Sequence, residues 1–116
     1  MVGASNLERS KKFYDAALGA LGIGPGVANK ERYFYMSPTG MFGITKPING
    51  KAASSANGGT IGFIAKSAEQ ANAWHAAGVA NGGTTCEDPP GMRDGGMYLA
   101  YLRDPDGNKL CAFVRK

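Results

Sequence analysis

The feature that most constrains the fold of this chain is a unit that occurs twice. Helix-start signals of the Ser-x-x-Glu/Gln type begin at Ser5 and at Ser67, and apolar residues follow each at helical spacing. An X-Pro-X-Gly turn between two apolar stretches then comes in both halves, at Pro38 and at Pro105. The chain is therefore predicted to contain two copies of one strand–helix–strands unit.

Each copy is predicted to begin with a short strand, residues 2–4 and 60–65, that leads into its helix. The first helix should end at Gly22, and the second at Gly78 or at Gly82-Gly83. Hairpins are predicted over residues 33–44 and 100–111, with the turn glycine at positive φ. A unit this small cannot cover its own sheet, so we expect the two copies to share a core.

Length and composition indicate one globular domain, residues 1–116, with a first module at about 1–56 and a second at about 57–116. Hydrophobic residues make up 43% and charged residues 19% of the chain, and no apolar run is long enough for a membrane span. Residues 5–12 are polar where a signal peptide would be apolar. We therefore expect no membrane partner, a cytoplasmic location, and free thiols at Cys86 and Cys111 rather than a disulfide.

The basic charge of the chain does not indicate a nucleic-acid partner. The formal net charge is +4, but the lysines and arginines are dispersed and form no run. No nucleic-acid-binding motif accompanies them, so a solvated basic surface is the better interpretation.

Three stretches resemble the vicinal oxygen chelate superfamily, which includes glyoxalase I, bleomycin resistance proteins and extradiol dioxygenases. VGASNLERSKKFYDAALGALG at 2–22 is similar to its first strand and helix, and DPDGNKLCAF at 104–113 to its C-terminal hairpin. GTIGFIA at 59–65 and the loop PGMR at 90–93 resemble a glyoxalase-like subgroup. The resemblance implies an α+β fold of paired βαβββ modules, whose curved mixed sheets surround a cavity that a homodimer often completes.

The resemblance also implies four positions for the ligands of a divalent metal. Three of them fall on Ile44, Thr60 and Cys111, and the fourth lies one or two residues before Met1. A divalent ion needs converging imidazole or carboxylate donors, which these residues do not supply. We therefore expect no metal and no other cofactor.

Strand alternation and the repeat together predict which side chains line the cavity. Cys111 should point inward, with Tyr101 opposite it across the hairpin, while Arg93 could close over the ligand as a fork for an anion. Arg93 could equally be solvated and paired with Asp88 or Asp94. The predicted ligand-binding residues are Thr60, Tyr101, Cys111, Arg93, Phe34, Phe42, Ile44, Phe113 and Lys109. The alternative is that these side chains simply fill a core.

Two further residues have reactive side chains. His75 is the single histidine and lies beside Trp74 on the second helix, so a surface position is expected rather than a ligand or a base. Cys111 could act as a nucleophile, with Lys109 two residues away, but an inert buried thiol is the better interpretation.

Three functional hypotheses follow. The first is a glyoxalase-like protein that binds a small, mostly apolar organic molecule without a metal. The second is a lyase or isomerase for a thiol-conjugated or enolisable substrate, although no metal or cavity glutamate is predicted to assist the proton transfer. The third is drug sequestration of the bleomycin-resistance type, which the basic charge of the chain disfavours for a cationic drug.

Overall fold

The structure, a computed structural model, describes residues 1–115 and contains two helices and nine strands. In chain order these are β1 (Val2–Gly3), α1 (Leu7–Ala20), β2 (Val27–Asn29), β3 (Arg32–Ser37), β4 (Gly40–Thr45), β5 (Ile61–Ala65), α2 (Ala68–Ala80), β6 (Thr84–Thr85), β7 (Gly91–Met92), β8 (Tyr98–Arg103) and β9 (Lys109–Val114). Neither helix in residues 1–115 is long and apolar enough to cross a membrane.

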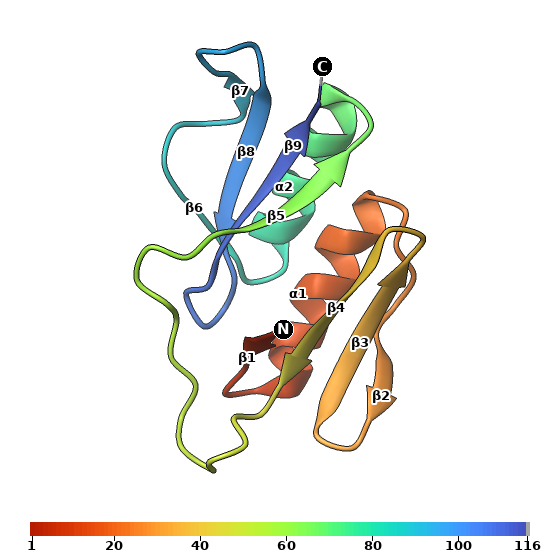
Figure 1. Cartoon of the computed structure of the whole chain (residues 1–116), viewed down its shortest axis with the longest axis vertical. Helices are drawn as coiled ribbons and strands as arrows, with labels where there is room; N and C mark the ends of the chain where they lie inside the picture. The colour runs from red at the N-terminus through yellow and green to blue at the C-terminus, as the bar shows by residue number, and fades with distance from the viewer. Residues whose placement is uncertain (116) are drawn as a thin grey trace.

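The strands form two mixed sheets with the same topology (Figure 1). The first sheet has the order β1-β4-β3-β2, and the second has the order β5-β9-β8-β6 with β7 paired to β8. In each sheet the first strand of its half lies parallel to the last one, β1 to β4 and β5 to β9, and the other pairs are antiparallel. The predicted α+β class and the doubled unit are therefore confirmed.

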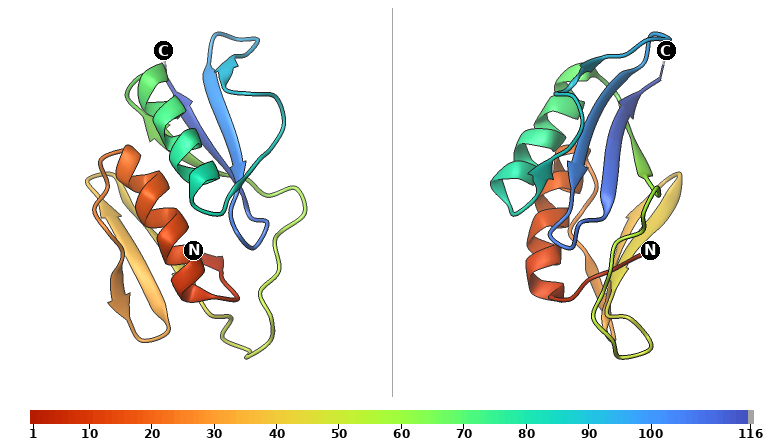
Figure 2. Two further views of the ribbon diagram at one scale, coloured as in Figure 1. Left: turned by 180° about the vertical axis from the view of Figure 1, so that it is seen from behind. Right: turned by 90° about the vertical axis from the view of Figure 1, so that its left-hand side faces the viewer.

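Both helices lie side by side on one face of the two sheets (Figure 2). Because one layer of helices covers both sheets, the two halves share a single core. Its largest fully buried side chains are Phe13, Tyr14, Leu18, Tyr35, Ile44, Trp74, Leu102 and Leu110.

The helix starts differ slightly from the sequence expectation. The cap of α1 is Asn6, whose side chain accepts a hydrogen bond from the Arg9 backbone N–H at 3.0 Å. Ser5 lies one residue before this cap, and its N–H donates to Asp106 instead. In α2 the predicted cap Ser67 is confirmed by its bond from the Gln70 N–H at 3.1 Å.

The second helix continues through Gly78 and ends near Gly82, which has a φ of +102°. An added Cβ at Gly78 would lie 2.3 Å from the Leu102 side chain. This glycine is therefore explained by the close approach of α2 to β8 rather than by helix termination.

The two hairpins have turns of different length. In the first, Ser37 pairs with Gly40 across Pro38-Thr39, so Gly40 is a strand residue and does not have the expected positive φ. In the second, Arg103 pairs with Lys109 across residues 104–108, and Gly107 has a φ of +91°. The second strand of the first hairpin, β4, is consequently one residue out of step with the repeat, which moves its residues to the other face of the sheet, whereas β3 keeps the predicted face.

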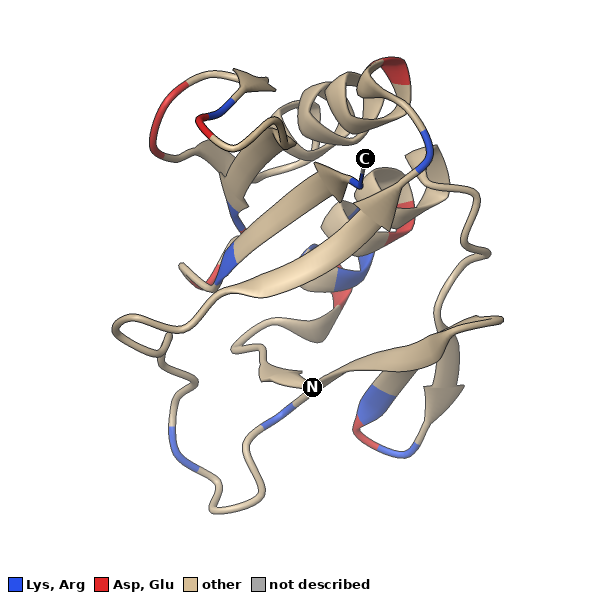
Figure 3. Ribbon diagram, turned by 45° about the horizontal axis from the view of Figure 1, so that its top comes forward, with Lys and Arg blue, Asp and Glu red and all other residues tan. Residues whose placement is uncertain are grey.

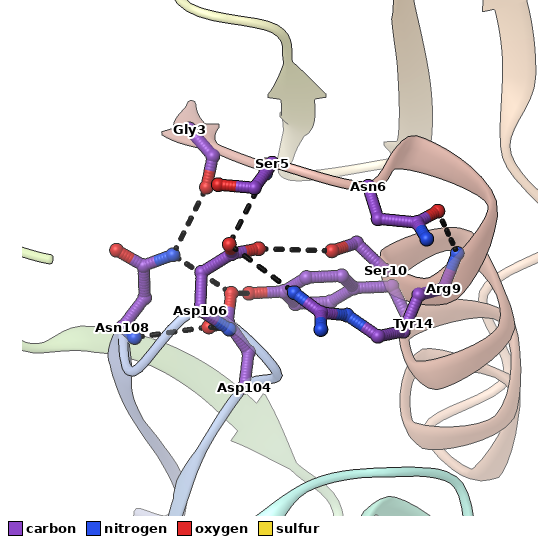
Figure 4. Close-up of polar contacts among 9 residues, drawn as sticks. All are labelled: Gly3, Ser5, Asn6, Arg9, Ser10, Tyr14, Asp104, Asp106 and Asn108. Carbon is purple, nitrogen blue, oxygen red and sulfur yellow. Dashed lines mark hydrogen bonds and ion pairs between the residues drawn. The ribbon is translucent and has the colours of Figure 1, made fainter. Parts of the chain in front are cut away.

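The second turn also joins the two halves of the molecule (Figure 4). The buried Asp104 carboxylate accepts a hydrogen bond from the Tyr14 hydroxyl at 2.5 Å, and the Asp106 carboxylate accepts from Ser10 at 3.2 Å. The Asn108 amide donates to the Gly3 carbonyl oxygen at 3.3 Å. The DPDGN stretch therefore docks the β8–β9 turn onto β1 and α1, and so fixes the second sheet relative to the first half.

Candidate functional site

The candidate site lies on the side of the sheets turned away from the helices, here called the open face. In β9, Leu110 and Ala112 are fully buried under the helices, so alternation turns Cys111 to the open face. Tyr101 pairs directly with Cys111, as the sequence predicted. An added Cβ at Gly62 would lie 3.2 Å from the Phe113 ring and 3.4 Å from the Cys111 sulfur, which places these residues on one surface.

Thr60 directly precedes β5 and is exposed at the edge of this surface. Lys109 reaches the same surface, since its Nζ lies 5.0 Å from the centre of the Tyr101 ring. The second sheet therefore brings together the five predicted residues Thr60, Tyr101, Lys109, Cys111 and Phe113. Whether they bind a ligand stays a prediction.

The first sheet contributes differently from the sequence expectation. Phe34 is on the open face, because an added Cβ at the adjacent Gly43 would lie 3.1 Å from its ring. Phe42 and Ile44 instead face the helices, where Ile44 is fully buried and the Phe42 ring lies 4.9 Å from that of Tyr14. The expectation that Phe42 and Ile44 line the cavity is therefore wrong, because the shorter turn shifts β4 by one residue.

This shift also changes the first-module counterpart of Cys111. Gly43 is opposite Phe34 just as Cys111 is opposite Tyr101, so the matching position is Gly43 rather than Ile44. Neither residue supplies a side-chain metal donor. Within residues 1–115 the structure contains no group of three or more His, Cys, Asp or Glu residues able to hold a metal ion.

A carboxylate that the sequence did not place at the site lies beside Lys109. Glu87 forms an ion pair with the Lys109 ammonium group, and this hydrogen bond raises the pKa of Lys109 although desolvation opposes it. The backbone of Glu87 is in the left-handed region, with a φ of +57°. Such a conformation costs a non-glycine residue about 1 kcal/mol and is often found at functional positions.

Burial and two nearby charges act on the pKa of the Cys111 thiol. Burial raises its pKa above the ordinary value, the nearby Lys109 acts in the opposite direction, and Glu87 raises it further. Cys86 and Cys111 are both free thiols in the structure. Because the thiolate is the reactive form, the structure agrees with an inert thiol at Cys111.

Arg93 adopts neither of the two predicted arrangements. Its guanidinium donates hydrogen bonds to the carbonyl oxygens of Asp88, Pro89 and Gly91 at 3.0–3.1 Å. It also lies 5.9 Å from the centre of the Tyr101 ring. Arg93 thus stabilises the conformation of its own loop and packs that loop on Tyr101. Its guanidinium neither points freely at a ligand anion nor pairs with Asp94.

His75 lies away from the open face, on α2. Its Nε2 is 3.2 Å from the Thr85 hydroxyl, and burial lowers its pKa. This contact joins α2 to β6, so His75 has a structural partner and is only partly at the surface.

Two large surface hollows are present, and neither is lined by Thr60, Tyr101 or Cys111. One is a shallow depression along α1, and the other lies between the β2–β3 turn and the linker that follows β4. The open face itself is a surface of the single chain, with Ile64 and Met41 exposed at 50% and 61%. A cavity at this face would need a cover in addition to these two sheets.

Comparison with known proteins identifies the family. The model of the glyoxalase/bleomycin resistance protein/dioxygenase superfamily matches residues 1–112. The chain belongs to this superfamily. This superfamily member is 71% identical to a glyoxalase/bleomycin resistance protein from Albidiferax ferrireducens T118, with a TM-score of 0.97 and coverage of 100% of this chain and 95% of that one.

More distant solved structures share the fold. A glyoxalase-related enzyme from Fulvimarina pelagi is 21% identical with a TM-score of 0.80, over 98% of this chain and 84% of that one. Lactoylglutathione lyase from Agrobacterium tumefaciens is 17% identical with a TM-score of 0.67, over 97% and 88%. At these identities the likeness concerns the fold alone. The comparison with curated proteins found no match.

Proposed function

We propose that this superfamily member binds a small, largely apolar organic molecule with an anionic group on the open face of the second sheet, without a divalent metal. The observation that carries the proposal is the surroundings of Tyr101. Its ring lies 5.0 Å from the Lys109 ammonium and 5.9 Å from the Arg93 guanidinium carbon, beside the Cys111 thiol. An aromatic surface with a few polar groups is typical of a small-molecule site.

The side chains at the superfamily's ligand positions do not fit a zinc or iron ion. Cys111 and Thr60 supply a thiol and a hydroxyl, and Gly43 supplies no donor. Such ions need three or four imidazole, carboxylate or thiolate donors that converge. The proposed binding therefore uses stacking on Tyr101 and the net positive charge of Lys109 and Arg93, of which Glu87 offsets only one.

Metal analysis tests the first part of this proposal. The protein is incubated with nickel, cobalt, zinc or iron(II), dialysed, and its metal content measured by mass spectrometry. We expect well below one equivalent of every metal. Retention of about one equivalent of any of them would show that the chain has a metal site.

An anionic aromatic probe tests the second part. Anilinonaphthalene sulfonate should bind with increased fluorescence, and Tyr101→Ala should weaken the binding about tenfold, since base or ring stacking on an aromatic side chain contributes about 1–3 kcal/mol. Val79→Ala is the matched control, because Val79 is an exposed apolar residue on α2. Equal loss in both variants would reject the open face as the site.

The position of Glu87 favours a second candidate, a lyase or isomerase acting on a thiol-conjugated substrate. A carboxylate beside Cys111 and Tyr101 could take the proton from an enolisable carbon. The test is the isomerisation of the hemithioacetal of methylglyoxal and glutathione, with and without added metal. Turnover that Glu87→Gln abolishes would support this candidate, and a rate equal to background would remove it.

Drug sequestration is less well supported. Two cations, Arg93 and Lys109, flank Tyr101, and a cationic drug would be repelled there. Glu87 is already paired with Lys109, so it offers little compensation.

We also propose that a second copy of the chain covers the open face, and that the protein acts in the cytoplasm. The exposure of Ile64 and Met41 supports the first proposal, and the two free thiols support a reducing compartment. Analytical ultracentrifugation should give twice the chain mass of 12.1 kDa. A monomer at micromolar concentration would contradict the dimer.

A further inference from the structure

The surface hollow beside the linker has an unusual charge. We call it the basic hollow: it has a volume of about 740 Å3 and lies between the β1–α1 connection, the β2–β3 turn and the first residues after β4. Its ionisable lining residues are Lys30, Arg32, Lys46, Lys51 and Glu31. Four cations and one carboxylate give it three net positive charges.

This charge comes from two segments that lie on either side of the β3–β4 hairpin in the sequence. Figure 3 shows basic residues on the linker after β4 and on the turn between β2 and β3, at the same end of the molecule. Positive charges gathered in one hollow repel each other. Together they attract anions and so raise the local concentration of anions there. The single acid, Glu31, pairs with Lys46 at 3.4 Å, but both side chains are more than half exposed and neutralise each other only weakly.

The walls of the basic hollow are shaped by hydrogen bonds. The Lys46 N–H donates to the Glu31 carbonyl oxygen at 3.1 Å, which ties the linker to the β2–β3 turn. The Gly50 N–H donates to the Pro47 carbonyl oxygen at 3.1 Å, and the Lys51 N–H donates to the Asn49 side chain at 3.0 Å. The linker therefore turns back at this point and directs residue 51 toward the hollow instead of away from the molecule.

One of the cations is held in position and still has free donors. The Arg32 Nε donates to the Thr45 hydroxyl at 3.3 Å, which fixes the stem of the side chain. Within residues 1–115 its two terminal nitrogens have no hydrogen-bond partner, so they remain available to an oxyanion.

An apolar side chain lies at the rim of the same hollow. Ile48 lines it and is 94% exposed, with Pro47 and Ala52 nearby in the lining. A fully exposed isoleucine beside several cations gives the hollow an apolar side as well as a charged one. A ligand with an anionic group and a hydrocarbon part would match both sides.

We propose that the basic hollow binds a small organic dianion, such as a phosphomonoester or a dicarboxylate, with its charges near Arg32 and Lys51 and its hydrocarbon part along Ile48. This site is separate from the open face around Tyr101. It contains none of the residues proposed to bind the ligand there, so each proposal can fail without the other.

Nuclear magnetic resonance titration with phenyl phosphate at low ionic strength tests the proposal, with phthalate as the dicarboxylate arm. The amide signals of residues 30–32 and 45–52 should shift and saturate, while phenol should leave them unchanged. Arg32→Gln and Lys51→Gln should each weaken binding about fivefold to tenfold, as expected for one partly screened charge contact. Raising the salt to about 150 mM should weaken it further, because the Debye length falls to about 8 Å.

The matched control is Lys66→Gln, which removes an exposed lysine on the β5–α2 connection outside the hollow. All three variants change exposed side chains, and unchanged thermal midpoints establish that they remain folded. Shifts that do not saturate, or an equal loss of affinity in Lys66→Gln, would reduce the effect to general attraction by a basic surface and overturn the proposal. Shifts centred on residues 99–113 would likewise overturn it, because they would place the anion at the open face.

Discussion

The two hairpin turns have the same X-Pro-X-Gly pattern but different surroundings. The first, at Pro38-Thr39, is exposed, and its Ser37 hydroxyl bonds within the turn, to Thr39 and Gly40. The second, at residues 104–108, is partly buried and contacts β1 and α1. One copy of the repeat therefore uses its turn as a simple connection, whereas the other uses it to hold the two halves together.

The difference explains what the DPDGN stretch does. Asp104 accepts hydrogen bonds from the Tyr14 hydroxyl, from the Asn108 amide, and from two backbone N–H groups of its own turn. Burial raises the pKa of Tyr14 well above its usual value, and the adjacent Asp104 raises it further. Asp104 is thus an architectural residue, whose carboxylate is engaged by four hydrogen bonds within its own turn and to α1.

Removal of the Asp104 carboxylate should have the largest effect. Asp104→Ala leaves the Tyr14 hydroxyl and two backbone N–H groups without a buried partner, and we expect the free energy of unfolding to fall by about 3 kcal/mol. Ser37→Ala in the first turn should change it by less than about 0.5 kcal/mol. Urea unfolding followed by circular dichroism measures both. Similar losses would mean that the second turn does not join the halves.

The turn glycines should differ by a smaller amount. Gly107 has a φ of +91°, and an added Cβ would also lie 3.3 Å from the Ser55 hydroxyl, so Gly107→Ala should cost about 1–2 kcal/mol. Gly40 has no atom within 4 Å of an added Cβ and no positive φ, so Gly40→Ala should be neutral or slightly stabilising. Thermal unfolding of the pair tests this. A cost at position 40 equal to that at 107 would contradict the assigned turn geometries.

The sequence predicted the doubled unit and the pairing of Tyr101 with Cys111, because helix caps, turns and alternation are local signals, and the family resemblance implied the two mixed sheets. It failed for Phe42 and Ile44, since the repeat suggested two turns of equal length. The number of residues in a turn decides the register, and neither Ser-Pro-Thr-Gly nor Asp-Pro-Asp-Gly specifies that number. A shift of the register by one residue exchanges the core face and the open face.

The contacts of the loop before β8 could also not be predicted from the sequence. The ion pair of Glu87 with Lys109 joins residues 22 positions apart in the chain, and Arg93 turns back to carbonyl oxygens of its own loop. No periodicity governs such a loop, because its shape depends on which backbone acceptors come within reach. The acid beside the candidate site was therefore missed, although the strand residues around it were placed correctly.

The open faces of the two sheets differ in their ionisable groups, just as the two turns differ in their contacts. Gly43 opposite Phe34 has no ionisable group, while Cys111 opposite Tyr101 has a thiol close to the ion pair of Lys109 and Glu87. The rate at which that thiol is alkylated depends on its pKa and so on these two charges. This rate therefore tests whether the second sheet has an electrostatic environment that the first sheet lacks.

The smallest expected effect is on the alkylation of Cys111 by iodoacetamide, with Cys86 as an internal reference in the same sample. Burial raises the pKa of Cys111, so its alkylation should be slow near pH 7 and should accelerate as the pH rises above the ordinary thiol range.

Lys109→Met removes the charge that lowers this pKa and should slow alkylation further, by about twofold to threefold. Glu87→Gln removes a charge that raises it and should accelerate alkylation by a similar factor. The rates are measured by peptide mass spectrometry across pH 6–10. Opposite changes of the alkylation rate in the two variants are expected only if both charges act on the thiol. Changes of the same sign would mean that opening of the loop, rather than the charge of Lys109 and Glu87, controls access to Cys111.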